Sequence, residues 1–198
     1  MEIVIASKNT GKIKEIKSIY PAPANVKWLT FKDFKDFPDT NEEGSSFIEN
    51  ARIKARTISL YTGKITLADD SGLEVDFLGG RPGVRSSRYS GENSTDKQNR
   101  DKLLEERKEV KEISRRTARF VCYMVLHDPE KGILFETRGI CEGFIGFEEK
   151  GSGGFGYDCI FIPSGYNKTM AQLTQAEKNN ISHRGKALRA MYEFIVNF

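Results

Sequence analysis

The sequence predicts an α/β protein built on a mixed β-sheet flanked by helices. Near the N-terminus, a strand pattern over residues 2–6 is followed by a loop and then a helical pattern, which is typical of a parallel sheet. Further along, two strand patterns are joined by a short turn at 127–132, which is typical of an antiparallel hairpin. The two observations together predict a sheet with both kinds of pairing.

The composition predicts a single domain over residues 1–198. Apolar residues make up 38% of the chain and charged residues 30%, which leaves enough apolar side chains for a core. The net charge of +3 is too small to indicate nucleic acid as a partner, and no run of about 20 apolar residues predicts a membrane span. Cys122, Cys141 and Cys159 are too widely spaced for a disulfide framework or a zinc site. We therefore expect a cytoplasmic protein that binds neither nucleic acid nor a membrane.

The first strand and helix follow from β-branched residues and from helical spacing. Residues 2–6 are strongly β-branched and predict a strand that ends near Ala6. Apolar residues at helical spacing follow Gly11, and Pro21 and Pro23 are expected to end that helix.

The next elements are a capped helix and a buried strand. Ser46 and Glu49 have the spacing of a capping box, with Glu49 reaching back to the N-cap, before a helix that runs to about Tyr61. A strand follows over 64–68, and the turn-forming sequence from Asp69 to Gly72 is expected to close it.

The second half of the chain predicts a loop, two helices and three strands. His127 lies in the turn of the hairpin and is expected on the surface. The predicted elements are an ordered loop over 79–94, a helix over 95–110, strands over 116–126 and 133–140, a strand over 157–162 after a Gly-rich run, and a last helix from Ser182 that carries Leu188, Met191, Ile195 and Phe198 on one face.

Two polar segments follow predicted strands, where ligands bind in α/β proteins. Between a strand and a helix, Ser7–Lys12 combines helix N-terminal amides with lysine, as in a phosphate site, although it is not a Walker A loop. An ordinary strand-to-helix turn explains it equally well. Asp69 and Asp70 point to opposite sides of an extended chain, so one could hold a metal while the other orients a water. Glu42 or Glu43 could supply a further oxygen.

Three further positions could contact a ligand, each with a plainer alternative. Asn50 and Lys54 share a helix face that differs from the apolar stripe and usually faces solvent. Phe155, in a Gly-rich loop, could stack on a nucleobase or belong to the core. His183 and Arg184 lie near the positive end of the last helix, which suits an anionic ligand between them, or a solvated surface.

Six segments in order along the chain resemble the inosine triphosphate pyrophosphatase family, also called Ham1-like. Together they extend from residue 7 to residue 185, and six motifs in register are highly specific. The segments are Ser7–Lys12, Phe47–Ala51 with Lys54-Ala55, Ala68–Leu73, Pro82-Gly83 with Ser87–Gly91, Gly154–Asp158 and Ser182–Gly185.

The resemblance implies hydrolysis of dITP, ITP and XTP to the monophosphate and pyrophosphate, with Mg²⁺ as cofactor. It implies Asp70 as the general base and a metal ligand and Glu42 as a second ligand, with help from Asp69. Either Glu42 or Glu43 could be the one that faces the metal. The residues it implies for nucleotide binding are Ser7, Lys8, Asn9, Thr10, Gly11, Lys12, Lys54, Ser71, Phe155, Gly156, Tyr157, Asp158, Lys178, His183 and Arg184.

The resemblance also implies a homodimer and an elongated mixed sheet with a cleft between two lobes. Two other functions remain as alternatives: a Maf-like pyrophosphatase of other nucleotides, and a nucleotide sensor without catalysis. The intact Ser182–Gly185 and Gly154–Asp158 segments argue against the first, and the retained Asp pair and Lys12 argue against the second. An RNA-binding module is the weakest alternative, because no dense basic patch with interleaved aromatic residues occurs.

Overall fold

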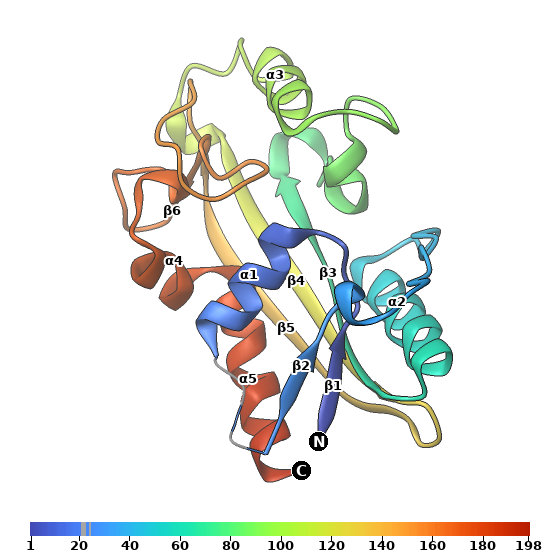
Figure 1. Cartoon of the computed structure of the whole chain (residues 1–198). Coiled ribbons are helices and arrows are strands. Elements are labelled where there is room, and N and C mark those ends of the chain that lie inside the picture. The colour runs from blue at the N-terminus through green and yellow to red at the C-terminus, as the bar shows by residue number, and fades with distance from the viewer. Residues whose placement is uncertain (21–22, 24) are drawn as a thin grey trace. The chain divides into compact units, whose positions relative to one another are not determined.

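The computed structural model describes residues 1–20, 23 and 25–198 (Figure 1). The predicted helix end at Pro21 lies outside these residues, whereas the helix itself ends at Ile19. The helices are α1 (Thr10–Ile19), α2 (Phe47–Thr62), α3 (Asp96–Glu106), α4 (Gln175–Ile181) and α5 (His183–Asn197). The strands are β1 (Glu2–Ile5), β2 (Lys27–Leu29), β3 (Ile65–Val75), β4 (Thr117–Asp128), β5 (Gly132–Ile145) and β6 (Phe161–Pro163).

The six strands form one mixed sheet in the order β2-β1-β3-β4-β5-β6. Strand β1 is parallel to both β2 and β3, with Val4 opposite Leu29 and Thr66. Strands β5 and β6 are antiparallel, with Phe144 opposite Ile162. The predicted α/β class and the mixed sheet are therefore confirmed.

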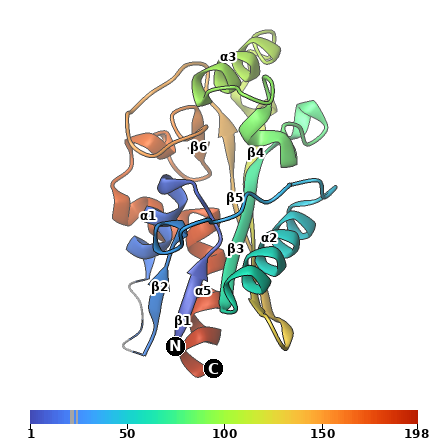
Figure 2. The ribbon, with the colours of Figure 1, turned by 45° about the vertical axis from the view of Figure 1, so that its right-hand side comes forward.

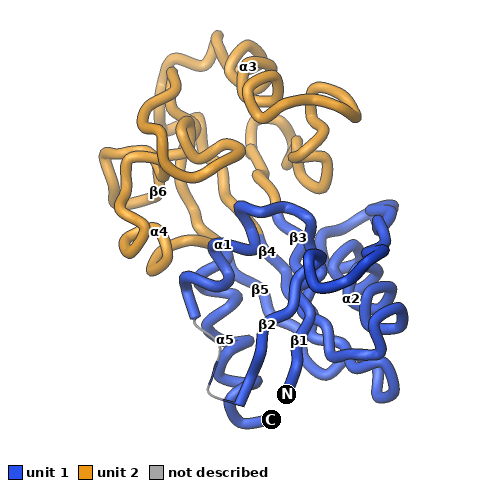
Figure 3. Tube along the Cα trace, viewed as in Figure 1, with its two compact units in different colours: residues 1–71, 122–139, 184–198 blue, residues 72–121, 140–183 orange. Residues whose placement is uncertain are grey.

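The chain divides into two compact units, which Figure 3 shows in blue and orange. Unit 1 contains residues 1–71, 122–139 and 184–198, and unit 2 contains residues 72–121 and 140–183. Each unit has a hydrophobic core of its own.

In unit 1, strand alternation sends successive side chains to opposite faces of the sheet. Ile3, Ile5 and Leu67 pack with α1 and α5, whereas Val4 and Ala68 pack with α2. Figures 1 and 2 show α2 covering one face of β1 and β3, and α5 covering the other. Each residue of β3 in this unit therefore points either to α2 or to α1 and α5.

In unit 2, the segment Ser87–Gly91 is held to α3 by one buried side chain. Asn99 of α3 accepts a hydrogen bond from the amide of Ser90 at 2.7 Å and donates one to the carbonyl of Ser87 at 3.0 Å. Ser94 donates to the same side-chain oxygen at 2.8 Å. Asn99 therefore fixes the shape of this family-like segment.

Strand β3 is longer than expected. The strand was predicted to end at Ala68, but it continues through Asp69 and Asp70 to Val75. Turn chemistry suggested an end at Asp69–Gly72, but pairing within the sheet overrides that local preference. The two aspartates therefore lie inside a strand, not in a turn after it.

The predicted strand over 157–162 is shorter and later than expected. Only Phe161–Pro163 pairs with β5, and the residues before it form turns. Tyr157 instead contributes to the core of unit 2, because its hydroxyl donates to the Ser86 carbonyl at 2.8 Å and its side chain is buried. Phe198, expected on the buried face of the last helix, lies beyond the end of α5 and is exposed.

Two local expectations are also wrong. His127 is buried on β4, not on the surface, and its Nδ1 lies 2.7 Å from the Ser59 hydroxyl of α2. The prediction failed because β4 extends two residues past Leu126, so His127 belongs to the strand. At the start of α2, Ser46 is the N-cap as predicted, but the carboxylate of Glu49 accepts from Ser45 rather than from Ser46.

No helix within the described part of the chain is both long and apolar enough to span a membrane.

Candidate active site

The loop after β1 forms the start of α1 and carries the predicted phosphate-binding residues. Asn9 is the N-cap of α1, and its side-chain oxygen accepts a hydrogen bond from the amide of Lys12 at 3.1 Å. The amide of Asn9 donates to the hydroxyl of Ser7, also at 3.1 Å. The loop thus presents the positive end of a ten-residue helix, which favours phosphate. Lys8 pairs with the exposed Asp39 at 2.6 Å.

Cationic groups surround the carboxylate of Asp69. Its Oδ2 lies 3.0 Å from Nζ of Lys12 and 3.1 Å from Nη2 of Arg184. Ser71 donates its hydroxyl hydrogen to the same oxygen at 3.1 Å, and Arg184 donates to the Ser71 hydroxyl at 2.7 Å. The second Nη atom of Arg184 is paired with Glu15 of α1. Asp69 therefore links β3 to α1 and α5.

The charges around Asp69 determine the pKa values of this cluster. Burial alone would raise the pKa of Asp69, but Lys12 and Arg184 outweigh it and hold that pKa well below its usual range. Burial alone would lower the pKa of Arg184, and Asp69 and Glu15 raise it instead. The lowered pKa favours the ionised form of Asp69, which is therefore unsuited to accept a proton.

A different set of side chains surrounds Asp70. Its Oδ1 lies 3.0 Å from Nζ of Lys54, and its Oδ2 accepts a hydrogen bond from Nδ2 of Asn50 at 3.1 Å. The same ammonium lies 3.0 Å from an oxygen of Glu42. Asn50 and Lys54 are buried, so the expectation of a solvent-facing helix surface was wrong at both positions.

Burial makes Asp70 a weaker acid than an ordinary aspartate. It raises the pKa of Asp70, and the opposing effect of Lys54 offsets only part of that rise. For Lys54 the balance is reversed: burial lowers its pKa, but Asp70 and Glu42 together raise it above the usual value. A carboxylate with a raised pKa beside a fixed cation is suited to accept a proton.

The two neighbouring aspartates therefore differ because of strand geometry. Asp69 points to the face of β3 that packs on α1 and α5, and Asp70 points to the face covered by α2. This confirms the expectation that they point to opposite sides. It also separates Asp69 from Glu42 and Asp70. Within residues 1–20, 23 and 25–198, no three His, Cys, Asp or Glu side chains are grouped as metal ligands.

Unit 2 holds the other predicted binding group, in the Gly-rich loop before β6. Nζ of Lys178 lies 2.6 Å from Oδ2 of Asp158, and both side chains are buried. The amide of Phe155 donates to the same oxygen at 2.9 Å, and the Lys178 ammonium lies 5.3 Å from the Phe155 ring centroid. A Cβ at Gly154 would lie 2.0 Å from that carboxylate oxygen, so only glycine fits there.

Gly156 and His183 are held by other residues of unit 2. The amide of Gly156 donates to Asp96 at 2.8 Å, and its carbonyl accepts from Arg100 at 2.8 Å. The ring of His183 stacks on Phe120 with centroids 4.8 Å apart and an interplanar angle of 14°. His183 is therefore buried beside an aromatic ring, not on a solvated helix end.

Sequence reasoning missed the roles of two buried residues. Glu15 follows Lys12 by three residues on α1, so both lie on one helix face, which was a usable signal. Asn50 was noticed only as a neighbour of Lys54 and was assigned to no role. Its contact with Asp70 spans 20 positions along the chain, and local sequence patterns carry no information on such contacts.

Comparison with known proteins identifies the family. A sequence profile of the Ham1 family matches residues 3–194, which is almost the whole chain. The chain belongs to the Ham1 family. The resemblance stated from the six segments is therefore confirmed.

Individual Ham1 relatives support the same assignment. The chain is 46% identical over 191 residues to the dITP/XTP pyrophosphatase of Streptococcus agalactiae serotype V, covering 96% of the chain and 58% of that relative. The chain thus spans little more than half the length of that protein. It is 47% identical over 194 residues to the dITP/XTP pyrophosphatase of Bacillus licheniformis, covering 96% of the chain and 95% of that relative.

Two solved Ham1 structures share the fold. The HAM1 protein of Coxiella burnetii superposes with a TM-score of 0.88 at 40% identity, covering all of both chains. The Ham1 protein of Staphylococcus aureus superposes with a TM-score of 0.86 at 38% identity, covering 100% of this chain and 99% of that one.

Proposed function

We propose that this Ham1-family protein hydrolyses the non-canonical purine nucleoside triphosphates dITP, ITP and XTP to the monophosphate and pyrophosphate. One observation carries the proposal. Two adjacent buried aspartates of β3 lie in unit 1 together with two lysines and the loop at the start of α1. Asp69 is paired with cations, and Asp70 has a raised pKa. The dITP/XTP pyrophosphatases among its relatives support the choice of substrate.

In this proposal Asp70 is the general base. It accepts a proton from a water molecule whose oxygen attacks the α-phosphorus. The bond from that phosphorus to the bridging oxygen breaks, and pyrophosphate leaves. The raised pKa of Asp70 supports this role, because a base with a pKa nearer to neutrality takes up the proton more readily. Phosphoryl transfer needs positioning and charge neutralisation more than a covalent nucleophile.

The cations of unit 1 are suited to neutralise the phosphates. Lys12 and Lys54 supply fixed positive charge, and the amides at the start of α1 supply hydrogen-bond donors. We assign Ser7–Lys12 to the triphosphate. Ser71 and Arg184 hold the Asp69 carboxylate in the same unit.

Glu42 and Asp70 fit a magnesium ion. Both carboxylates contact the Lys54 ammonium at 3.0 Å, so their oxygens point towards the same place, and Mg²⁺ uses one or two carboxylates with substrate phosphates and waters. Glu43 instead accepts a hydrogen bond from Asn41, which favours Glu42 as the ligand. When bound, the ion would supply charge neutralisation for the phosphate oxygens. We leave Asp69 out of this proposed ligand set, because its Oδ2 is held by Lys12 and Arg184.

We assign the nucleobase to residues of unit 2. Phe155 offers an aromatic face, and Gly156, Tyr157 and Asp158 shape its loop. Hypoxanthine and xanthine carry a 6-keto acceptor where adenine carries a 6-amino donor. Lys178 and His183 can donate hydrogen bonds to the 6-keto oxygen of the first two bases, but not to the 6-amino group of adenine. A hydrogen-bonded site can reject such a mismatched base by about 10⁴-fold.

We further propose a cytoplasmic homodimer. None of the three cysteines is in a disulfide with another described residue, and two of them are buried, which fits a reducing compartment. Size-exclusion chromatography with light scattering tests the dimer.

The decisive experiment separates the reaction from its alternatives. Purified protein with Mg²⁺ is incubated separately with dITP, XTP, dGTP and ATP, and pyrophosphate and orthophosphate are quantified. Pyrophosphate from dITP and XTP, with little from the other two, is the expected result. Orthophosphate as the product would contradict attack at the α-phosphorus, and binding without turnover would identify a sensor.

Asp70→Asn tests the catalytic assignment. The amide cannot accept the proton, so turnover should fall by about 10²–10⁴-fold while dITP still binds. Glu42→Gln should raise the Mg²⁺ concentration needed for half-maximal rate, and Glu43→Gln is the matched control that should not. Near wild-type turnover in Asp70→Asn would exclude Asp70 as the base.

A further inference from the structure

One buried amide connects the two halves of the proposed metal and proton site. Asn50 of α2 is fully buried, and both ends of its side-chain amide are used. Its Nδ2 donates to Oδ2 of Asp70 at 3.1 Å, and its Oδ1 accepts from the amide of Gly44 at 2.8 Å. Asn50 therefore touches both β3 and the segment that carries Glu42.

The contacts close a ring within unit 1. Glu42 binds Lys54, Lys54 binds Asp70, Asp70 binds Asn50, and Asn50 binds Gly44, which is two residues from Glu42. One oxygen of Asp70 is held by Lys54 and the other by Asn50, so the plane of that carboxylate is set by two partners on successive turns of α2.

The approach of Gly44 to Asn50 depends on the absence of a side chain at residue 44. A Cβ there would lie 2.7 Å from Oδ1 of Asn50, 2.8 Å from Cβ of Glu49 and 3.0 Å from the Asn50 amide nitrogen. Two of these three atoms lie in the backbone or at a Cβ, so they cannot move aside as a flexible side-chain end would. The glycine therefore brings the Glu42 segment close to the amide.

The chemistry of the ring requires an amide at residue 50. Asn offers a donor to the carboxylate and an acceptor to the backbone amide at once, and neither function depends on pH. An aspartate would place a second carboxylate against Asp70 and lose the donor. An alanine would take the donor from the buried Oδ2 of Asp70 and the acceptor from the partly buried amide of Gly44.

We infer that Asn50 is a positioning residue that sets the orientation of Asp70 and the separation of Asp70 from Glu42 without contacting the nucleotide. The inference rests on the proposed function, since it assigns the geometry that Asp70 and Glu42 need for it. Displacement of a reacting group by about 1 Å costs on the order of 10²-fold in rate.

The test compares Asn50→Ala and Asn50→Asp with wild type on dITP. Turnover should fall by about 10²-fold in both variants with KM changed less than about threefold, since the loss concerns positioning rather than binding. Mn²⁺ binding without nucleotide, followed by electron paramagnetic resonance, should weaken at least about tenfold in Asn50→Ala, because Glu42 and Asp70 no longer share a fixed separation.

Asn99→Ala is the matched control. Asn99 is equally a buried asparagine whose amide bridges a backbone amide and a carbonyl, but it lies in unit 2 and contacts neither aspartate. It should lose thermal stability as Asn50→Ala does, yet bind Mn²⁺ like wild type. A loss of Mn²⁺ binding in both variants would show a general folding defect and overturn the inference.

A double-mutant cycle gives a second readout. Gly44→Ala displaces the Glu42 segment but leaves Asn50 able to bind Asp70, so its effect on turnover should be strongly non-additive with that of Asn50→Ala. Additive effects would overturn the inference. So would turnover and Mn²⁺ binding in Asn50→Ala within twofold of wild type.

The Mn²⁺ measurement also separates this inference from the proposed function. If wild type releases no pyrophosphate from any nucleotide, the proposed function fails, but weaker Mn²⁺ binding in Asn50→Ala alone would still support the role of Asn50. If wild type hydrolyses dITP and Asn50→Ala does so equally well, only the inference fails. A wild-type protein that hydrolyses dITP but binds no Mn²⁺ without nucleotide would overturn the inference alone.

Discussion

Units 1 and 2 each bury arginine side chains completely, but they stabilise the charge in different ways. In unit 1, Arg184 is paired with the carboxylates of Asp69 and Glu15. In unit 2, Arg116 pairs with no carboxylate among the described residues and donates instead to four backbone carbonyls, those of Arg107, Val110, Ile145 and Gly146, at 2.7–3.0 Å. The effects on pKa are opposite: it is raised for Arg184 and lowered by burial for Arg116.

The difference separates an arginine that pairs with carboxylates of the candidate site from one that holds backbone segments together. A charge-paired arginine keeps a neighbouring carboxylate ionised, as Arg184 does for Asp69. An arginine among carbonyls acts as a multivalent donor that closes a loop, and it confers no charge on its partners. Arg116 joins the segment before β4 to the end of β5 in this second way.

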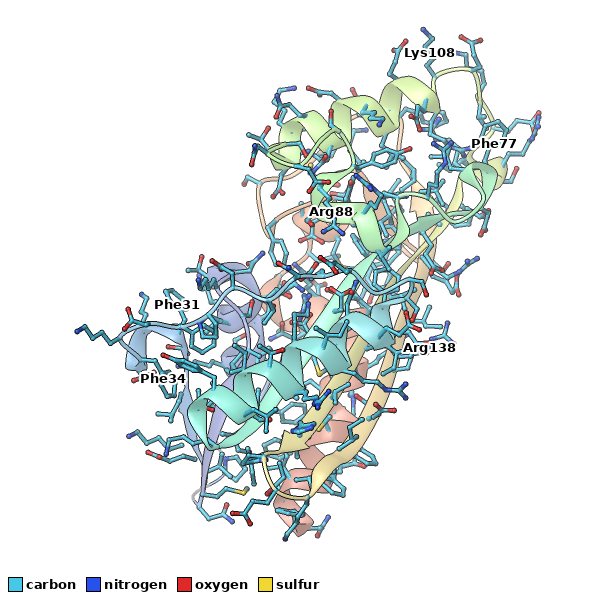
Figure 4. The ribbon with its side chains drawn as sticks, turned by 90° about the vertical axis from the view of Figure 1, so that its right-hand side faces the viewer. Phe31, Phe34, Phe77, Arg88, Lys108 and Arg138 are labelled. Atoms are coloured by element: carbon cyan, nitrogen blue, oxygen red, sulfur yellow. The ribbon has the colours of Figure 1, made fainter. Side chains whose placement is uncertain are left out.

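Arg107, the second buried arginine described in unit 2, makes fewer hydrogen bonds than Arg116. It is fully buried, and only its Nη2 has a hydrogen-bond partner, the carbonyl of Arg115 at 2.8 Å. Nε and Nη1 have none among the residues that the structure describes. Its guanidinium lies 4.7 Å from the centroid of the exposed Phe77 ring, a residue labelled in Figure 4. The exposed ring is therefore what covers this charge.

Arg184→Met should have the largest effect on stability. It removes a cationic partner from two buried carboxylates, Asp69 and Glu15, which costs about 3–5 kcal/mol of unfolding free energy. Urea denaturation at pH 7 measures it. A loss below 1 kcal/mol would mean that the ion pairs contribute little and would remove the contrast between the units.

Arg116→Met should rank next. Four carbonyls lose a donor, and since some recover a partner or water, we expect a loss of about 2–4 kcal/mol. Pyrophosphate release from dITP at a temperature where the variant is folded should stay within threefold of wild type. A rate more than tenfold below wild type at that temperature would show that the unit 2 arginine also serves catalysis.

The pH dependence of stability should distinguish the two regions. Because the folded-state pKa of Asp69 is lowered, its contribution is complete above the ordinary value of about 3.9 and is lost progressively as the pH falls below it. The difference in unfolding free energy between wild type and Asp69→Asn should therefore shrink from pH 7 to pH 3. The difference between wild type and Arg116→Met should stay constant, because no carboxylate is involved. A constant difference for Asp69→Asn would contradict its lowered pKa.

Arg107→Met should have the smallest effect and the opposite sign. Two nitrogens of the buried Arg107 guanidinium lack a hydrogen-bond partner among the described residues. Replacing it by an apolar side chain of similar length should raise the unfolding free energy by about 1 kcal/mol, despite the loss of the one hydrogen bond from Nη2. A rise in melting temperature, with unchanged dITP hydrolysis, is the expected result. Destabilisation would mean that the Phe77 contact outweighs the unsatisfied nitrogens.

Prediction from sequence succeeded where structure is local. The N-cap at Ser46 follows from residues within one turn of it, and the first strand and helix lie where their patterns placed them. The opposite directions of Asp69 and Asp70 also follow from alternation along one strand.

Prediction failed where distant segments decide. Turn-forming residues after Ala68 were expected to end a strand, but β3 continues because neighbouring strands pair with it. His127 was assigned to a surface turn because its partner Ser59 lies 68 residues away, and the residues next to His127 do not indicate that contact. Both errors come from contacts that local propensity does not encode.

The sequence by itself determined the family, the α/β class and most residues of the candidate site, because these are properties of short motifs in a fixed order. Only the tertiary structure decided which partners each residue has there. It made Asp69 the partner of Arg184 and Asp70 the partner of Lys54 and Asn50, since α1 and α5 pack on one face of β3 and α2 on the other. The physical reason is that burial and charge, which set each pKa, depend on which helix covers a side chain and not on its neighbours along the chain.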